Sequence, residues 1–224
     1  MAGGLKNFFF KINTSIGNVE KTKMSQEFND SVERYNTYST LLDPLVSKLE
    51  GALQQNPEVL STSCIESPKG ENPHELLAAS LEIFKTYQRD ENLVKIDAFI
   101  EKRKKLAKTH RKGQVGGRHA IKALRRFFSF EYKDVCTEND KLTQARDYMD
   151  MIKHDVKTAK NTVQIENSAT LYEEAVRIFN DQAKQVIQLL DALPKVQQTH
   201  TDGIAEYFDC LQKNNAEMLH IIKS

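Results

Sequence analysis

One stretch of the chain, residues 102–126, gathers many positive charges and no negative ones. It contains eleven Lys or Arg residues and no Asp or Glu. They are Lys102, Arg103, Lys104, Lys105, Lys108, Arg111, Lys112, Arg118, Lys122, Arg125 and Arg126. Ammonium and guanidinium groups bind phosphates, so the stretch predicts contact with a polyanion. An anionic membrane surface and a nucleic acid are the two candidates, and a charged helix that faces only solvent is the alternative.

The charge of the whole chain makes this stretch more informative. The formal net charge is only +1, from 32 basic and 31 acidic residues. Residues 1–24 add four Lys against one Glu, so the remainder of the chain is acidic. A nearly neutral protein with its charge segregated in this way has an electropositive face.

The first 20 residues form a second informative pattern. On a helix, at about 100° per residue, their apolar side chains fall within a stripe roughly 100° wide. The stripe contains Leu5, Phe8, Phe9, Ile12 and Ile16, and Lys6 and Lys11 lie off it. Three glycines weaken this helix in water, which is typical of a segment that becomes helical at a membrane interface. A terminal helix packed on the core is the alternative.

No pattern in the chain predicts catalysis. The six His residues form no zinc-binding HExxH or HxxxH pair, and the glycines of GQVGG lack the preceding strand of a dinucleotide site. The three cysteines are isolated and odd in number, which predicts neither disulfides nor a metal site and favours a reduced, cytoplasmic compartment. We therefore expect no enzyme activity, no metal and no cofactor. No apolar run approaches the ~20 residues of a membrane span.

Long helices must position these residues, because hydrophobic residues recur in alternating steps of three and four. The pattern predicts a first helix over about residues 25–55. Its seam consists of Phe28, Val32, Tyr35, Ser39, Leu42, Val46, Leu49 and Leu53. Pro44 should kink it. A proline-rich insert, residues 56–73, follows.

The second helix is expected over about residues 74–160, with a bend or local break at Gly113, Gly116 and Gly117. Its seam closes with Leu142, Ala145, Met149, Ile152 and Val156. After a turn at 160–169, a capping-box pattern at Thr170 and Glu173 predicts a third helix over about 169–222, kinked by Pro194. Three seams of this length cannot be buried in a compact monomer. They predict an all-α, elongated antiparallel coiled coil that dimerises, with a single spectrin-like bundle as the alternative.

Over essentially its whole length the chain resembles the N-BAR domains of the endophilin family. The resemblance is carried first by GLKNFFFKI, GNVEKTKMSQEF, LQQNPE and NPHELL, and then by EYKDVC, KLTQARDYMD, IFNDQAKQVIQLLDALP and GIAEYFDCLQ. The kinking proline stands where amphiphysin has one. Two features depart from the family: the insert is shorter, and the glycines of GQVGG interrupt a normally regular helix.

The resemblance implies a crescent-shaped homodimer of BAR domains with a basic concave face. That face would bind anionic phospholipid membranes and sense or generate curvature, as in tubulation, endocytosis or vesicle trafficking. Residues 1–24 would be the membrane-inserting segment and 25–224 the BAR domain, with the insert near the middle of the concave face. The family's distal basic cluster maps onto Lys153, Lys157 and Lys160.

Two other functions remain open at this point. The chain could be a structural coiled-coil adaptor for another protein, or residues 102–126 could bind nucleic acid. The stretch has no interleaved aromatic residues before Phe127 and Phe128, so no nucleic-acid partner is expected. A Phe-rich amphipathic segment beside a basic face favours a cytoplasmic, peripheral membrane protein.

Overall fold

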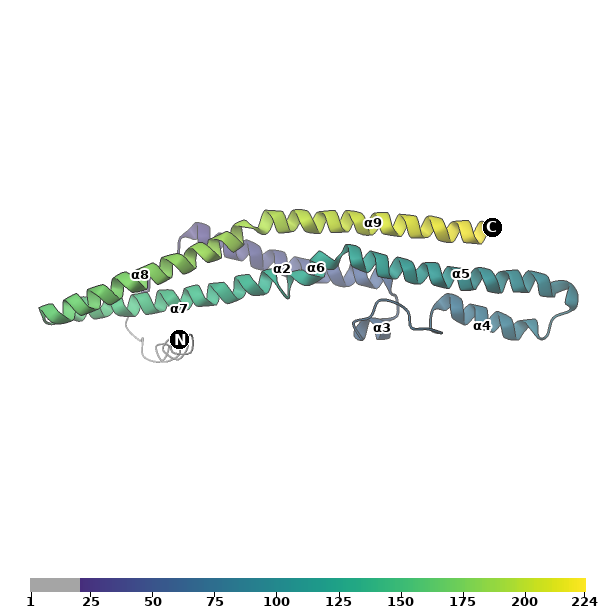
Figure 1. Ribbon diagram of the computed structural model, residues 1–224, viewed down its shortest axis with the longest axis horizontal. Helices are drawn as coiled ribbons and strands as arrows, with labels where there is room; N and C mark the ends of the chain where they lie inside the picture. The colour runs from purple at the N-terminus through teal and green to yellow at the C-terminus, as the bar shows by residue number, and fades with distance from the viewer. Residues whose placement is uncertain (1–20) are drawn as a thin grey trace. The chain divides into compact units, whose positions relative to one another are not determined.

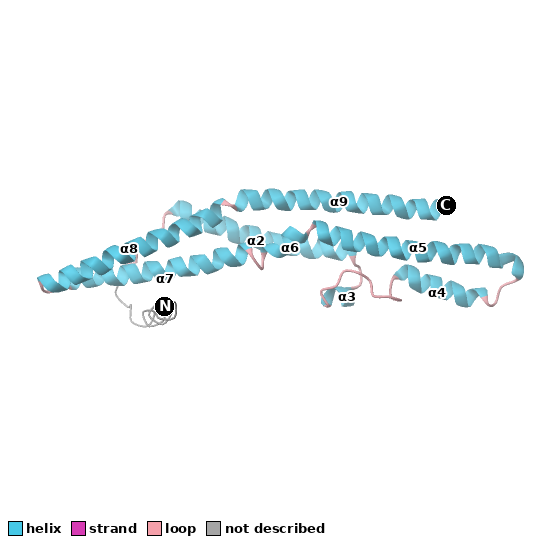
Figure 2. Ribbon diagram, viewed as in Figure 1, coloured by secondary structure: helices cyan, strands magenta, loops and turns pink. Residues whose placement is uncertain are grey.

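The computed structural model describes residues 21–224, and in this range every regular element is an α-helix (Figures 1 and 2). The predicted membrane-inserting residues of the N-terminal segment lie outside the described residues. The helices are α2 (Gln26–Leu53), α3 (Pro57–Ser61), α4 (Pro73–Lys85), α5 (Asp90–Ala120), α6 (Lys122–Phe127), α7 (Glu131–Thr158), α8 (Thr162–Asp191) and α9 (Leu193–Lys223).

The chain divides into two compact units. The first unit contains the residues up to Ser39 together with Phe127–Lys195, and the second contains Thr40–Arg126 and Val196–Ser224. The whole basic stretch, residues 102–126, therefore belongs to the second unit. Each unit is built around one helical hairpin, α7 with α8 in the first and α4 with α5 in the second.

The first unit joins α7 to α8 through residues 159–161. Asn161 has an extended backbone, and its side chain accepts a hydrogen bond from the Gln164 backbone N–H at 2.9 Å, so it caps α8. The prediction that the third helix begins near residue 169 is therefore wrong, because the cap at Asn161 starts the helix about two turns earlier in the sequence. Residues 160–169 lack a clear apolar period since most of their side chains are exposed.

The seams of α7 and α8 meet in the core of the first unit. Met149 and Ile152 are buried against Ala175, and Tyr172 and Phe179 pack on this cluster. In the α7 part of the predicted seam, Leu142, Ala145, Met149 and Ile152 are confirmed as buried, and Val156 is half-buried.

Asp150, a buried residue of α7, binds the segment of chain that precedes α2. Its carboxylate accepts hydrogen bonds from the backbone N–H of Thr22, at 2.7 Å, and from the Thr22 hydroxyl. The charge assistance makes these bonds stronger than neutral ones. Thr22, near the end of the predicted N-terminal segment, is therefore fixed to the first unit.

The second helix does not run unbroken over residues 74–160, so that prediction is wrong. The chain turns at residues 86–89, where the N–H groups of Thr86, Tyr87 and Gln88 bond back to carbonyls three residues earlier. The α4 and α5 helices then form a hairpin (Figure 1). The turn was missed because it contains neither Gly nor Pro and the apolar pattern continues on both sides of it. Ala78, Ile96 and Ile100 form the hairpin's core.

The local break predicted at the glycines of α5 is not found at these residues. The helix continues through them to Ala120, and they let neighbouring helices approach closely. A Cβ atom on Gly113 would lie 2.5 Å from the Asn214 side chain of α9, and one on Gly117 would lie 2.5 Å from the Leu53 side chain of α2. The breaks fall instead at Ile121 and at residues 128–130.

The first-helix seam is confirmed from Tyr35 to Leu53, where every member is buried, while Phe28 and Val32 are half-buried. The α2 helix continues through Pro44. The predicted insert contains α3, which Asn56 caps by accepting a hydrogen bond from the Glu58 N–H at 3.0 Å. The third helix is interrupted at Ala192, two residues before Pro194. There α8 ends and α9 begins.

Candidate functional site

The basic stretch lies on two consecutive helices of the second unit. Eight of its cations are on α5 and three, Lys122, Arg125 and Arg126, are on α6. The α5 helix buries one face, formed by residues such as Leu106, Thr109 and Gly113, against its neighbours. The cations therefore fall into those that face solvent and those at the edge of the packed face.

Lys105, Lys108 and Lys112 share the solvent face of α5, because residues three and four apart lie on the same side of a helix. Lys112 pairs with Glu217, with Nζ and Oε2 3.1 Å apart, but its side chain is 75% exposed. Lys105 and Lys108 are exposed and make no ion pair with any residue in the described range. These two ammonium groups are therefore available to an external anion.

Lys104 lies beside this face with its charge already matched. Its Nζ is 3.0 Å from Glu82 of α4 and 3.2 Å from Glu101. The hydrogen bonds to these carboxylates raise the pKa of Lys104. At the start of the stretch, Lys102 Nζ donates to the Ile222 carbonyl at 3.4 Å.

Arg111 connects α5 to the chain between α3 and α4. Its Nε donates a hydrogen bond to the Ser67 carbonyl at 2.8 Å, and its Nη2 donates one to the Pro68 carbonyl at 2.8 Å. The guanidinium also donates hydrogen bonds to both carboxylate oxygens of Glu75. The hydrogen bond from Arg111 is the main reason that the pKa of Glu75 falls to about 2. The guanidinium is thus used within the protein, and its role here is structural.

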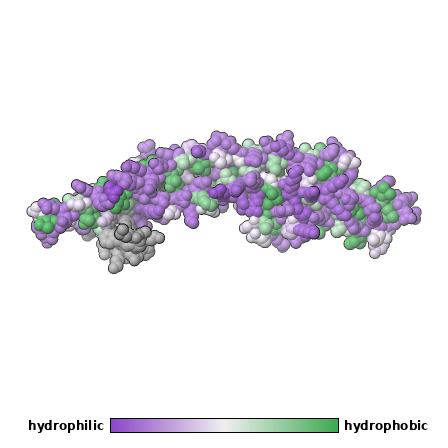
Figure 3. Space-filling view, in the orientation of Figure 1, coloured by the Kyte–Doolittle hydropathy of each residue, from purple (hydrophilic) through white to green (hydrophobic). Residues whose placement is uncertain are grey.

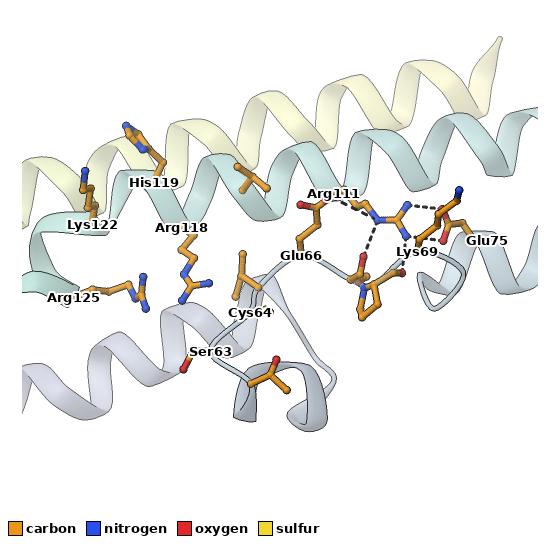
Figure 4. A pocket seen from close by; sticks show the side chains of 15 residues that line it. Ser63, Cys64, Glu66, Lys69, Glu75, Arg111, Arg118, His119, Lys122 and Arg125 are labelled. Atoms are coloured by element: carbon orange, nitrogen blue, oxygen red, sulfur yellow. Dashed lines mark hydrogen bonds and ion pairs between the residues drawn. The ribbon is translucent and has the colours of Figure 1, made fainter.

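Arg118 and Arg125 share a single carboxylate, that of Glu50 on α2. The Nε atoms of the two arginines lie 3.5 and 2.6 Å from Glu50 Oε1. Both arginines line an open groove of about 1110 Å³ between residues 62–69 and the α5–α6 helices (Figure 4). The groove is also lined by His119, Lys122 and Lys69.

The remaining predicted cations lie elsewhere. Lys153 and Lys157 are on α7, and Lys160 is in the turn that follows it, so all three belong to the first unit. Arg126 is exposed on α6. Lys6, Lys11 and the apolar stripe of residues 5–16 lie outside the described residues.

A buried polar network at the start of α4 was not expected as a unit. The Asn72 side chain is fully buried, and its Oδ1 accepts from the His74 N–H at 3.0 Å. Its amide nitrogen therefore faces His110 Nδ1, also at 3.0 Å, so that ring nitrogen must be unprotonated. The Asn72-Pro73 sequence signals the cap, but nothing local signals a partner 38 residues away.

Both histidines of this network favour the neutral form. Burial is the largest cause that lowers the pKa of each ring. Arg111 lowers the pKa of His110 further, while His110 and Arg103 lower that of His74. The Arg103 guanidinium, which can only donate, lies 3.4 Å from His74 Nδ1. The network therefore belongs to the fold and responds to pH.

Residues 21–224 contain no group of three or more His, Cys, Asp or Glu arranged to hold a metal ion. None of the helices described in this range is long and apolar enough to cross a bilayer. The basic surface of α5 and α6 is thus the feature of the second unit that a function must explain.

A family model described as the BAR domain matches residues 9–218. This match covers most of the chain, including both helical hairpins. The chain belongs to the BAR domain family. BAR domains are membrane-binding scaffolds, not enzymes; they dimerise, and they sense or induce membrane curvature. No curated protein matched the chain.

Proposed function

We propose that this BAR domain binds anionic phospholipid bilayers through the solvent face of α5 and generates or senses curvature as an endophilin-like N-BAR homodimer. The observation that carries the proposal is the pair of exposed, unmatched ammonium groups of Lys105 and Lys108, next to the largely exposed Lys112. Each cation held near an anionic leaflet contributes about 1 kcal/mol. A dimer doubles the number of such groups on one surface.

A second copy of the chain would also explain the apolar surface of the second unit. Ile83 and Phe84 of α4, Val94 and Phe99 of α5 and Phe208 of α9 are all more than half exposed. Hydrophobic side chains are visible over the α4–α5 hairpin in Figure 3. Exposed apolar side chains of this size are typical of a protein that a partner covers in part. We assign this surface to the homodimer.

The N-terminal segment, residues 1–24, is proposed to insert into the bilayer as an amphipathic helix, with residues 25–224 as the BAR domain. The bonds between Thr22 and Asp150 support this assignment, because they fix the root of the segment to the first unit. The distal cluster of Lys153, Lys157 and Lys160 would add to membrane binding at that unit. The protein would then act at the cytoplasmic face of a membrane.

Co-sedimentation with liposomes tests this proposal. The protein should pellet with vesicles that contain phosphatidylserine and stay in the supernatant with pure phosphatidylcholine. Raising the salt concentration from 0.1 M toward 1 M should weaken the binding, because the Debye length falls from about 10 Å to about 3 Å. An adaptor that binds only other proteins would pellet with neither vesicle.

A further inference from the structure

We infer that the groove between residues 62–69 and the α5–α6 helices is a binding site for a compact polyol that carries several phosphate groups. An inositol phosphate, either free or as a lipid headgroup, has this chemistry. The inference rests on the proposed function only for the lipid source. It names a specific ligand, whereas the solvent face of α5 recognises any anionic surface.

Arg111 builds the wall of this groove. Its bonds to Ser67, Pro68 and Glu75 hold the extended chain before α4 at a fixed position against α5. Its charge is matched by Glu75, and Glu66 lies 3.9 Å away. This end of the groove is therefore close to neutral, and a ligand gains little there.

The opposite end of the groove carries excess positive charge. Arg118 and Arg125 face one shared carboxylate, Glu50, so one of the two charges is unmatched. Lys122 is exposed and makes no ion pair in the described range. In Figure 4 the two guanidinium groups point toward the turn that contains Ser63 and Cys64. A phosphate between them would meet cations from both helices.

The Nε atoms of the arginine pair face Glu50 and not the ligand. Arg118 Nε and Glu50 Oε1 are shielded from solvent, so this side of the pair is closed to a phosphate. A phosphate would instead meet the outer guanidinium nitrogens. Arginine forks match the geometry of phosphate oxygens. We therefore assign the arginine pair as the phosphate-binding element, with Lys122 as a further cation at the edge of the groove.

The lining also restricts the class of ligand. It contains no Phe, Tyr or Trp, so the groove lacks the large aromatic side chains on which nucleotide bases most often stack. Its volume of about 1110 Å³ lies slightly above the range of about 300–1,000 Å³ that is usual for small-molecule sites. A phosphorylated ring without a base fits both observations.

Calorimetric titration of the full chain with inositol 1,4,5-trisphosphate tests the site in the absence of membranes. The wild type should bind saturably, and more tightly than it binds inorganic phosphate. Lys122→Glu should weaken binding at least about tenfold, since it replaces one charge-assisted contact by repulsion. Arg118→Lys should weaken it several-fold while keeping a cation opposite Glu50 and therefore the fold. Circular dichroism checks that both variants are folded.

Lys213→Glu is the matched control, because Lys213 is exposed on α9 and outside the groove. It makes the same change of charge and should bind the trisphosphate as the wild type does. Flat titration of the folded wild type, or equal losses in Lys122→Glu and Lys213→Glu, would overturn the assignment.

Vesicles distinguish the two sources of the ligand. If the source is a lipid, phosphatidylinositol bisphosphate should improve sedimentation over phosphatidylserine vesicles of equal charge, and the free trisphosphate should reverse that gain. If the source is soluble, the trisphosphate titrates but the two vesicles sediment the protein equally. Failure of all vesicle binding with a normal titration would reject the proposed membrane function and retain the site. Normal vesicle binding with a flat titration would reject the inositol phosphate site and retain the proposed membrane function.

Discussion

The buried network at the start of α4 gives a prediction whose magnitude follows from named bonds. Asn72→Ala removes the cap of α4, which is worth about 1 kcal/mol. It also removes the bond to His110 and leaves a half-buried ring nitrogen without its partner, at a cost of about 1 to 3 kcal/mol. The total loss of unfolding free energy is about 2 to 4 kcal/mol. For a chain of this size the melting temperature should fall by roughly 5 to 15 °C.

Asn161→Ala is the matched control. Asn161 caps α8 through one bond to the Gln164 N–H, but it is exposed and makes no second buried bond. Its loss should cost only about 1 kcal/mol. Thermal unfolding followed by circular dichroism, at one fixed protein concentration, measures both variants. Equal shifts for Asn72→Ala and Asn161→Ala would refute the reasoning that the contact between Asn72 and His110 stabilises the fold.

Two further predictions concern pH and helix packing. The lowered pKa values of His74 and His110 mean that the unfolded chain binds more protons than the native one below about pH 6.5. Their contribution to stability is therefore present above that pH and lost as the pH falls through the lowered native values. The urea midpoint should fall between pH 7.5 and pH 5.5, and by less in a His74→Asn, His110→Asn variant; an unchanged difference would contradict this. Gly203→Ala should destabilise the protein by about 1 to 3 kcal/mol, because the new Cβ would lie 2.8 Å from the Ala120 carbonyl oxygen. Gly51→Ala, with no atom within 4 Å, should instead stabilise it by up to about 1 kcal/mol, and urea unfolding that ranks the two variants in the opposite order would refute the packing role.

The repeat of apolar residues predicted the buried faces of the helices better than it predicted their ends. The seam residues between Tyr35 and Leu53, and those between Leu142 and Ile152, are buried as expected. An apolar seam must be covered wherever the helix lies. The turn at residues 86–89 was missed since it needs no special residue and is held by ordinary backbone bonds. The Asn161 cap was missed because the exposed start of α8 has no apolar period to mark it.

The chemistry of the basic stretch was only partly predictable. Its overall charge could be counted from the sequence. Which of its cations form ion pairs within the protein, and which stay available to a ligand, depends on carboxylates far away in the sequence. Arg111 is occupied by Glu75, and Arg118 shares Glu50 with Arg125, across separations that no local pattern encodes. The low helix propensity of the GQVGG glycines predicts a bend or local break, whereas in the structure these glycines let α5 pack closely against α2 and α9.

The solvent face of α5 is the proposed membrane-binding surface, and one sedimentation assay tests this role most directly. A Lys105→Glu, Lys108→Glu variant reverses two exposed charges that hold no partner in the described chain. A Lys48→Glu, Lys213→Glu variant makes the same change of net charge at exposed positions on α2 and α9. With phosphatidylserine vesicles, the α5 variant should lose most of the bound fraction, and the control should keep most of it. Equal binding by the two variants would contradict the assignment of α5 as the membrane-binding face.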